Sequence, residues 1–473
     1  MASKRRDRLV VAPGGRHLQR EDGTPFLYLA DTAWQLFHRL DADEADVYLT
    51  NRAEKGFTVV QAVVLAELGG LTVPNANGDL PLEDGDPTRP VEGYFAHVDR
   101  IVRRANELGL VVGMLPTWGS YWNQRTTSDA APAPTGGAGA GPVFDEANAR
   151  TYGEWLGRRY RDADLIWVLG GDNDIDTDGE RAVMNAMAAG IAAGDGGSHL
   201  RTFHPRGPGR SGEQLADADW IDFHMCQTSH GAPGHDTGIF IEADRALDPA
   251  KPVVDGEPRY ENIPIGFYNR SSTSAVRFTD YDTRTAAWWA VLAGAAGHTY
   301  GNNNVWQMYD EGRTPVIDAA VPWRRALDHP GAAQMGYLRE LLERVHWWKL
   351  RPAPLGGAVG HGVDVAAGGR AGSPRGDANP GAPFLVDAPA HGPAKVRAAL
   401  AEDGSAALVY SPKGEPFTLR LTALRRGRVR ERWFNPRYGT LHDIHTGSAR
   451  AFQTYAPPAK GDEADWVLVL EAV

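Results

Sequence analysis

The sequence predicts an α/β protein in which a (β/α)₈ barrel, residues 13–350, is followed by a small C-terminal β-sandwich. Short apolar runs alternate with longer amphipathic stretches through the barrel region, which is the pattern of parallel β-α-β units. Eight such runs in about 300 residues fit a closed barrel better than an open doubly wound sheet. No glycine-rich dinucleotide-binding turn follows the first run, and this weakens the nucleotide-binding alternative.

The eight expected strands are short runs of apolar and β-branched residues. In chain order they are 26–30, 57–65, 110–115, 165–169, 201–204, 220–224, 252–255 and 297–300. Helices are expected over 44–55, 94–108, 147–160 and 285–296. In the second of these helices, apolar residues such as Phe95, Val98 and Val102 recur close to the 3.6-residue period of an amphipathic helix.

The amino-acid composition of the chain changes after Trp348. Residues 351–382 are rich in Gly, Ala and Pro and predict a linker, and the short strands beyond them predict a β-sandwich over 383–473. A second stretch of similar composition, 130–142, follows the third strand. It is expected to be either a long loop over the mouth of the barrel or an insertion without a role.

Composition and charge exclude several classes of protein. Hydrophobic residues make up 42% of the 473 residues, which is enough for a globular core. The formal net charge is −11, and no basic stripe exists to neutralise phosphates, so a nucleic-acid partner is not expected. Because Cys226 is the single cysteine, an intramolecular disulfide and a zinc site of several thiolates are both excluded.

The sequence contains no pattern of a membrane anchor or a secretion signal. No apolar window approaches the ~18 residues of a membrane span, so no membrane partner is expected. The apolar run 9–12 is far shorter than the ~7–15 residues of a signal-peptide core, although a basic flank precedes it. We therefore expect a soluble, cytoplasmic protein, while secretion stays open if a leader has been trimmed and the oligomeric state stays unknown.

The residues that follow the predicted strands have an unusual mixture of chemical types. In a barrel of this kind, functional side chains lie at the carboxyl ends of the strands. Carboxylates, amides and imidazoles there would bind sugar hydroxyls, while indoles would pack on the C–H faces of a sugar. The candidate sugar-binding side chains are those of Asp31, Trp34, Glu67, Trp118, Trp122, Asn173, His204, His224, Gln227, Tyr260, Asn302, Asn303 and Trp306.

Two carboxylates are the candidates for catalysis. Asp172 follows the fourth strand and Glu257 the seventh, so they are expected to face each other across the barrel mouth. Glycoside hydrolysis needs such a pair, and a separation of about 5–5.5 Å is expected if the reaction retains configuration. Other interpretations stay open: Asp172 could cap the next helix, Glu257 could pair with Arg259, and Glu261 is a rival nucleophile.

Four stretches, 26–36, 165–173, 252–261 and 287–306, resemble the apiosidase-like glycoside hydrolases (family 140), a branch of the large retaining (β/α)₈ group. The resemblance runs from about residue 13 to about residue 348. The tail resembles the small β-sandwich, labelled as collagen-binding, that follows these barrels. In the barrel, the family's eighth-strand run Ala-Gly-His-Thr-Tyr-Gly matches residues 296–301.

The resemblance assigns roles to the two carboxylates. It implies that Asp172, at the end of the run Trp-Val-Leu-Gly-Gly-Asp, is the acid/base, and that Glu257, in Asp-Gly-Glu-Pro, is the nucleophile. The family often has a basic residue after the acid/base, where this chain has Asn173 and Asp174. This departure leaves the identity of the sugar open.

The expected function is therefore that of a retaining exo-glycosidase acting on a carbohydrate from a plant- or microbe-derived glycan or glycoside. By resemblance the sugar released is a terminal pentose, apiose first and arabinofuranose second, and neither a metal nor another cofactor is expected. Two alternatives stay open. One is a carbohydrate-binding barrel without catalysis, and the other is a metal-dependent hydrolase that uses His204, His224 and Asp255.

Overall fold

The structure is a computed structural model that describes residues 8–123, 142–228, 230–267, 276–353, 355, 383–425 and 427–473. Most of the stretch 130–142 and most of the expected linker 351–382 lie outside the described residues. The chain forms two compact units, Met1–Leu341 and Leu342–Val473, which are described separately below. No helix in the described ranges is long and apolar enough to cross a membrane.

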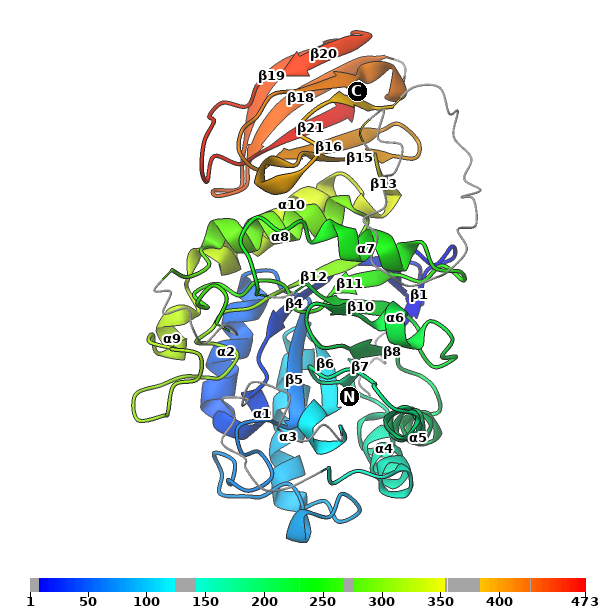
Figure 1. Ribbon diagram of the computed structural model, residues 1–473, viewed down its shortest axis with the longest axis vertical. Helices are drawn as coiled ribbons and strands as arrows, with labels where there is room; N and C mark the ends of the chain where they lie inside the picture. Colours follow the sequence, from blue (N-terminus) through cyan, green and yellow to red (C-terminus); the bar gives the residue numbers. More distant parts are fainter. Residues whose placement is uncertain are drawn as a thin grey trace. The chain divides into compact units, whose positions relative to one another are not determined.

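The first unit is built on a barrel of parallel strands with helices outside it (Figure 1). Its strands are β4 (Tyr28–Thr32), β5 (Val59–Leu65), β6 (Val111–Thr117), β7 (Leu165–Gly170), β8 (Arg201–His204), β10 (His224–Gln227), β11 (Val253–Asp255) and β12 (Gly297–Tyr300). They pair in parallel in the order β8-β7-β6-β5-β4-β12-β11-β10, and the short β9 (Gly209–Arg210) pairs antiparallel with β10. Between β8 and β10, the Thr202 hydroxyl donates to the carbonyl of Phe223 at 2.7 Å. The predicted barrel is confirmed.

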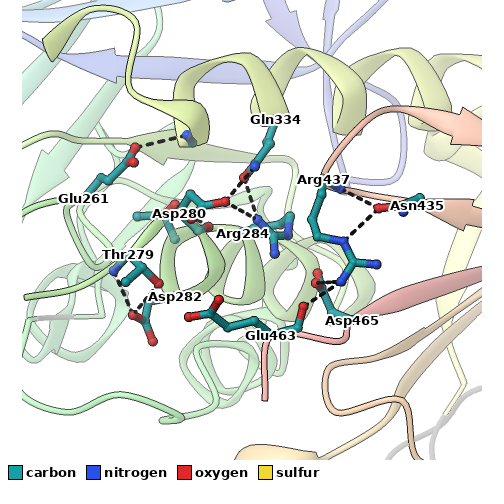
Figure 2. Close-up of polar contacts among 12 residues, drawn as sticks. Glu261, Thr279, Asp280, Asp282, Arg284, Gln334, Asn435, Arg437, Glu463 and Asp465 are labelled. Atoms are coloured by element: carbon teal, nitrogen blue, oxygen red, sulfur yellow. Dashed lines mark hydrogen bonds and ion pairs between the residues drawn. The ribbon is translucent and has the colours of Figure 1, made fainter. Parts of the chain in front are cut away.

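The barrel helices are α1 (Leu36–Arg39), α2 (Ala42–Glu54), α3 (Glu92–Glu107), α4 (Glu146–Tyr160), α5 (Asp178–Asp195), α6 (Ser211–Leu215), α7 (Gly238–Arg245), α8 (Asp280–Leu292), α9 (Trp323–Ala326) and α10 (Pro330–Arg344). Capping boxes at Asp41, Asp145 and Thr177 start α2, α4 and α5 by satisfying backbone N–H groups that lack a helical partner. Figure 2 shows how Arg284 on α8 donates to Gln334 on α10 at 2.6 Å, joining these two helices.

Helix α5 was not among the expected helices. Four glycines, Gly153 and Gly157 on α4 and Gly190 and Gly194 on α5, let the two helices approach closely. A Cβ on Gly190 would lie 2.2 Å from the backbone oxygen of Arg150. Glycine weakens the sequence signal of a helix because it is a poor helix former, yet here it allows the packing.

Two strands differ from their predicted positions. The first run divides into β3 (Pro25–Phe26), which forms a three-stranded sheet with β1 (Leu9–Val11) and β2 (Leu18–Arg20), and the barrel strand β4. The sixth barrel strand begins at His224, where the predicted strand was expected to end. Ile221 and Phe223 are buried in the segment before it, so the apolar run there reflects burial and not strand pairing.

The second unit consists of two antiparallel sheets, as expected for a β-sandwich. One has the order β13-β15-β16-β21-β18-β19 and the other β14-β17-β20. Their bounds are β13 (Leu350–Pro352), β14 (Leu385–Asp387), β15 (Arg397–Ala401), β16 (Ala406–Ser411), β17 (Phe417–Arg420), β18 (Arg428–Asn435), β19 (Thr440–Ser448), β20 (Phe452–Tyr455) and β21 (Trp466–Ala472). Phe417, Trp433, Tyr455 and Trp466 pack together in its core, whereas Tyr438 is exposed.

Candidate active site

The turn that follows β7 holds Asp172 in an uncommon backbone conformation. Gly170, Gly171 and Asp172 have φ angles of 95°, 90° and 58°, a region in which residues other than glycine are strained. A Cβ on Gly170 would lie 2.4 Å from the backbone oxygen of His204, and one on Gly171 would lie 3.0 Å from the backbone nitrogen of Gly119. The glycines thus allow the turn to pack closely against its neighbours, and this packing sets the position of Asp172.

Replacing Gly170 by alanine is expected to destabilise the protein. The added Cβ meets the backbone oxygen of His204 at a φ of 95°, and backbone strain of this kind alone costs about 1–3 kcal/mol. Gly109→Ala is the matched control, because Gly109 has a φ of 87° but no atom within 4 Å of an added Cβ. Urea unfolding should show a larger loss for Gly170→Ala, and equal losses would show that the close approach to His204 contributes nothing.

Glu257 follows β11 and is 6% exposed. The preceding Gly256 donates its backbone N–H to the carbonyl of Cys226 at 2.8 Å, which anchors the turn to β10. The Glu257 carboxylate lies between two imidazoles. Its Oε1 is 3.0 Å from Nε2 of His230, and its Oε2 is 3.1 Å from Nε2 of His204.

His230 is a site residue that the sequence pattern does not reveal. It lies in the loop after β10, which ends at Gln227, and loop residues have no periodicity from which their direction could be predicted. Its ring packs 4.5 Å from the ring of Tyr260. Tyr260, a predicted site residue, is buried and interacts electrostatically with Glu257. The only signal for His230 is its place shortly after a strand end.

The two candidate catalytic carboxyl groups have pKa values shifted in opposite directions. Burial, followed by the charge of Glu257, raises the pKa of Asp172 to about 7 against weaker opposing effects of neighbouring side chains. Burial also acts to raise the pKa of Glu257, but the contacts with His204 and His230 outweigh burial and lower it to about 2. Below neutral pH, Glu257 is therefore ionised while Asp172 carries a proton. Such a split suits one group to act as an acid and the other as an anion.

A third carboxyl group, that of Glu67, lies in the same electrostatic environment. Burial, followed by the charges of Asp172 and Glu257, raises the pKa of Glu67 well above its ordinary value, while Arg39 opposes this effect. Glu67 is 8% exposed. Within the described ranges its carboxyl oxygens accept no hydrogen bond from the protein. A slightly exposed carboxyl group that accepts no hydrogen bond from the described residues can bind a ligand hydroxyl.

Two of the predicted sugar-binding residues, Gln227 and Asn173, are neighbours of Asp172. The side chain of Gln227, at the end of β10, hydrogen-bonds to Asp172. Asn173 is partly exposed, and its amide donates to the carbonyl of Gly171 at 3.4 Å. The structure therefore brings the Gln227 amide to the carboxyl group of Asp172, whereas the Asn173 amide faces the backbone of the β7 turn.

The expectation that Asp31 binds sugar is wrong. Asp31 lies inside β4 and is fully buried. Its Oδ2 accepts hydrogen bonds from the Tyr48 hydroxyl at 2.5 Å and from Nε of Arg52 at 2.9 Å. Because Tyr48 and Arg52 belong to α2, the carboxylate points toward that helix and stabilises the barrel wall.

The expectation for His224 is also wrong. His224 begins β10 and pairs in register with Val253, the first residue of β11, so it lies at the amino end of the sheet. Its Nδ1 is 3.1 Å from the hydroxyl of Ser211, and burial, followed by nearby positive charges, lowers its pKa to about 4. His204 ends β8 at the opposite, carboxyl edge, so the two histidines do not form a common metal site.

The predicted aromatic platforms are more deeply buried than expected. Trp122 is 1% exposed, and its Nε1 donates to the carbonyl of Gly170 at 2.7 Å, so it supports the β7 turn and is not a sugar platform. Trp34 and Trp118 pack with ring centroids 5.6 Å apart, and Trp306 is likewise buried. These three rings belong to the barrel core cluster.

The asparagines after β12 organise their own loop, contrary to the expectation that they bind sugar. Asn302 and Asn303 are fully buried. Asn302 lies 2.9 Å from Nδ1 of His329, and Asn303 donates to the carbonyl of Ile317 at 2.7 Å. Asn303 also accepts a hydrogen bond from Nε1 of Trp306 at 3.2 Å.

The rival interpretations of the carboxylates find no support. Glu261 accepts hydrogen bonds from the Tyr300 hydroxyl at 2.6 Å and from the backbone N–H of Gly331 at 3.1 Å, the second of which can be followed to helix α10 in Figure 2. Thr177, and not Asp172, caps α5. The Arg259 guanidinium donates to backbone carbonyl groups. Among the described residues, no group of three or more His, Cys, Asp or Glu could hold a metal ion.

Two models of known protein families match the chain. The family model described as "Apiosidase-like, catalytic domain" matches residues 12–349, and the model described as "Putative collagen-binding domain of a collagenase" matches residues 380–471. No curated protein matches the chain.

Two solved structures are similar over nearly the whole chain. A protein named "Glycoside hydrolase" is 29% identical, with a TM-score of 0.79 and coverage of 98% of this chain and 97% of the other. A glycoside hydrolase family 5 protein from Bacteroides vulgatus ATCC 8482 has the same identity and TM-score, with 98% and 93% of the two chains covered.

Proposed function

Because the chain belongs to the apiosidase-like family of glycoside hydrolases, we propose that it is an exo-acting, retaining glycosidase. Its substrate is a plant- or microbe-derived glycan or glycoside from which it releases a terminal pentose, with an apiose-like sugar first and an arabinofuranose-like sugar second. The single observation that carries the pairing of an acid with an anionic carboxylate is the opposite shift of the pKa values of Asp172 and Glu257 within one site. Retention of configuration is proposed from the resemblance to the retaining (β/α)₈ group.

In the first step, the ionised Glu257 attacks the anomeric carbon of the sugar. An ester bond forms to the carboxylate while the glycosidic C–O bond breaks, and Asp172 gives its proton to the departing oxygen. His204 and His230 lie within hydrogen-bond distance of the two Glu257 oxygens. These contacts keep the carboxylate ionised and directed before the reaction.

In the second step, water releases the sugar from Glu257. Asp172, now a carboxylate, takes a proton from water, whose oxygen attacks the anomeric carbon and breaks the ester bond. The charge of Glu257 is one cause of the raised pKa of Asp172, and that charge disappears in the ester. The pKa of Asp172 therefore falls in the intermediate, which suits this group to act as the base.

Sugar recognition is proposed to involve Glu67, Gln227 and Asn173. Glu67 interacts electrostatically with both catalytic carboxyl groups, and Gln227 hydrogen-bonds to Asp172. Their amide and carboxyl groups offer both donors and acceptors to sugar hydroxyls. Trp34 and Trp118 form the apolar side of the same region beside His204.

A panel of nitrophenyl pentofuranosides and pentopyranosides tests this function. We expect hydrolysis of a pentofuranoside, with the monosaccharide as the sole sugar product and with no effect of a chelator on the rate. A folded protein that binds glycans but cleaves none of the panel would favour the non-catalytic barrel. Loss of hydrolysis after chelation would favour metal-dependent chemistry.

The pH dependence of kcat/KM is expected to be bell-shaped. Activity requires Glu257 ionised, so its lowered pKa places the acidic limb below the ~4.3 of an ordinary Glu side chain. Activity also requires Asp172 protonated, so the alkaline limb should lie near its pKa of about 7. Kinetics on one activated glycoside over the pH range of the folded enzyme would show both limbs. A flat profile from weakly acidic to alkaline pH would contradict the assignment.

A further inference from the structure

The imidazole of His204 contacts both loops that carry the catalytic carboxyl groups. Its Nδ1 accepts the backbone N–H of Asp172 at 3.2 Å, and its Nε2 lies 3.1 Å from Oε2 of Glu257. The side chain is fully buried, and the expectation that His204 binds sugar stays a prediction. One ring thus connects the turn after β7 to the turn after β11.

The first contact determines which nitrogen of the ring carries the proton. A backbone N–H can only donate, so Nδ1 must be the unprotonated acceptor. The ring proton is then on Nε2, the nitrogen that faces Glu257. Trp34 packs edge-on against the ring at 5.5 Å and 86°, which limits its rotation.

Resting on the proposed function, we propose that His204 is a positioning residue that couples the two catalytic carboxyl groups. Its Nδ1 holds the strained backbone of Asp172, which has a φ of 58°. Its Nε2 lies 3.1 Å from Oε2 of Glu257, without the alignment of a full hydrogen bond, and favours the ionised form of that carboxyl group through proximity. A displacement of either turn would therefore be transmitted to the other through this ring.

The groups around Glu257 indicate how much of its charge depends on His204. His230 supports the other carboxylate oxygen, and Tyr260 interacts with the same group. Asp172 and Glu67 are the neighbouring carboxyl groups, and both interact electrostatically with Glu257. Because each imidazole faces a different oxygen, loss of His204 should weaken the ionised form of Glu257 without removing all of its support.

Two substitutions separate the two contacts. His204→Asn keeps an acceptor near the position of Nδ1 but has no group near Nε2, whereas His204→Gln places its amide near Nε2 and loses the acceptor. We expect His204→Asn to move the acidic limb of kcat/KM upward by about one pH unit or more. His204→Gln should keep that limb and lower kcat by ~10- to 100-fold on poor leaving groups, because Asp172 is displaced.

His199→Asn is the matched control for the loss of a buried imidazole. His199 is bound to Asp195 and to the carbonyl of Ala163, and it touches neither catalytic carboxyl group. This variant should lower the melting temperature and leave both pH limbs in place. An unshifted acidic limb in a folded, active His204→Asn variant would overturn the proposal, as would an identical, pH-independent loss in both His204 variants.

A measurement that does not need turnover distinguishes this inference from the proposed function. In protein labelled with ¹⁵N-histidine, the His204 signals, assigned by their loss in His204→Asn, should show a protonated Nε2 and an unprotonated Nδ1 at neutral pH. This result would support the coupling even if every tested glycoside were inert. A proton on Nδ1 would overturn the coupling, whatever the activity of the enzyme.

Discussion

Glu257→Gln and Glu257→Ala are expected to lose turnover on every glycoside by ~10⁴-fold or more, the order of effect produced by removing a catalytic nucleophile. The carboxylate is required whatever the leaving group, because without it no ester to the sugar can form. Glutamine keeps the size of the side chain, so a loss in Glu257→Gln cannot be attributed to a cavity. Steady-state kinetics on good and poor leaving groups measure the effect.

Glu261→Gln is the matched control for this prediction. Glu261 accepts hydrogen bonds from Tyr300 and from the backbone of Gly331, so its substitution should lower thermal stability and leave most of the turnover. Substantial activity in Glu257→Gln together with an inactive, folded Glu261→Gln would reverse the two roles.

The loss of rate in Asp172→Ala is expected to depend on the leaving group of the substrate. A poor leaving group needs the proton of Asp172, so natural glycosides should lose ~10²- to 10⁴-fold in rate. An activated aryl glycoside departs without that proton and should keep part of the first step. The second step then becomes slow, because the base that activates water is missing.

Added azide provides the decisive readout for Asp172→Ala. Azide attacks the ester without needing a base, so it should speed turnover and give a glycosyl azide with the configuration of the substrate. Asp174→Ala is the control. The Asp174 carboxylate accepts hydrogen bonds from the backbone N–H of Arg206 and from the side-chain amide of Gln214, so its loss should give no azide effect. If Asp172→Ala is as inactive as Glu257→Ala and azide does nothing, Glu67 becomes the next candidate for the acid.

The barrel could be predicted from the sequence because its strands are buried throughout. Every residue of β5 and of β6 is buried, so each strand forms a mostly apolar run, interrupted only by Gln61 in β5 and ended by Thr117 in β6, that stands out between amphipathic helices. Burial also extends beyond the ends of the strands, and this makes the bounds of a strand difficult to predict. Three of the four residues 220–223 are apolar, and two of these, Ile221 and Phe223, are buried before β10 begins. This segment therefore resembled a strand, and the expected place of His224 shifted to the wrong end of the sheet.

The directions in which individual side chains point could not be predicted from the sequence. Asp31 was expected to follow a strand, but β4 extends through Thr32, and the carboxylate instead meets Arg52 on α2. His230 reaches Glu257 from a loop, where no periodic pattern exists. By contrast, Asp172 and Glu257 sit in short motifs directly after strands, and the structure places both in one site.

The most direct test of the account is to identify the residue that carries the sugar during turnover. Asp172→Ala should accumulate the glycosyl-enzyme on an activated pentofuranoside, because its second step is slow. Intact-protein mass spectrometry should show one added pentosyl group, and peptide mapping should place it on Glu257. A sugar found on Glu67 or Glu261, or a directly formed product of inverted configuration, would contradict the mechanism.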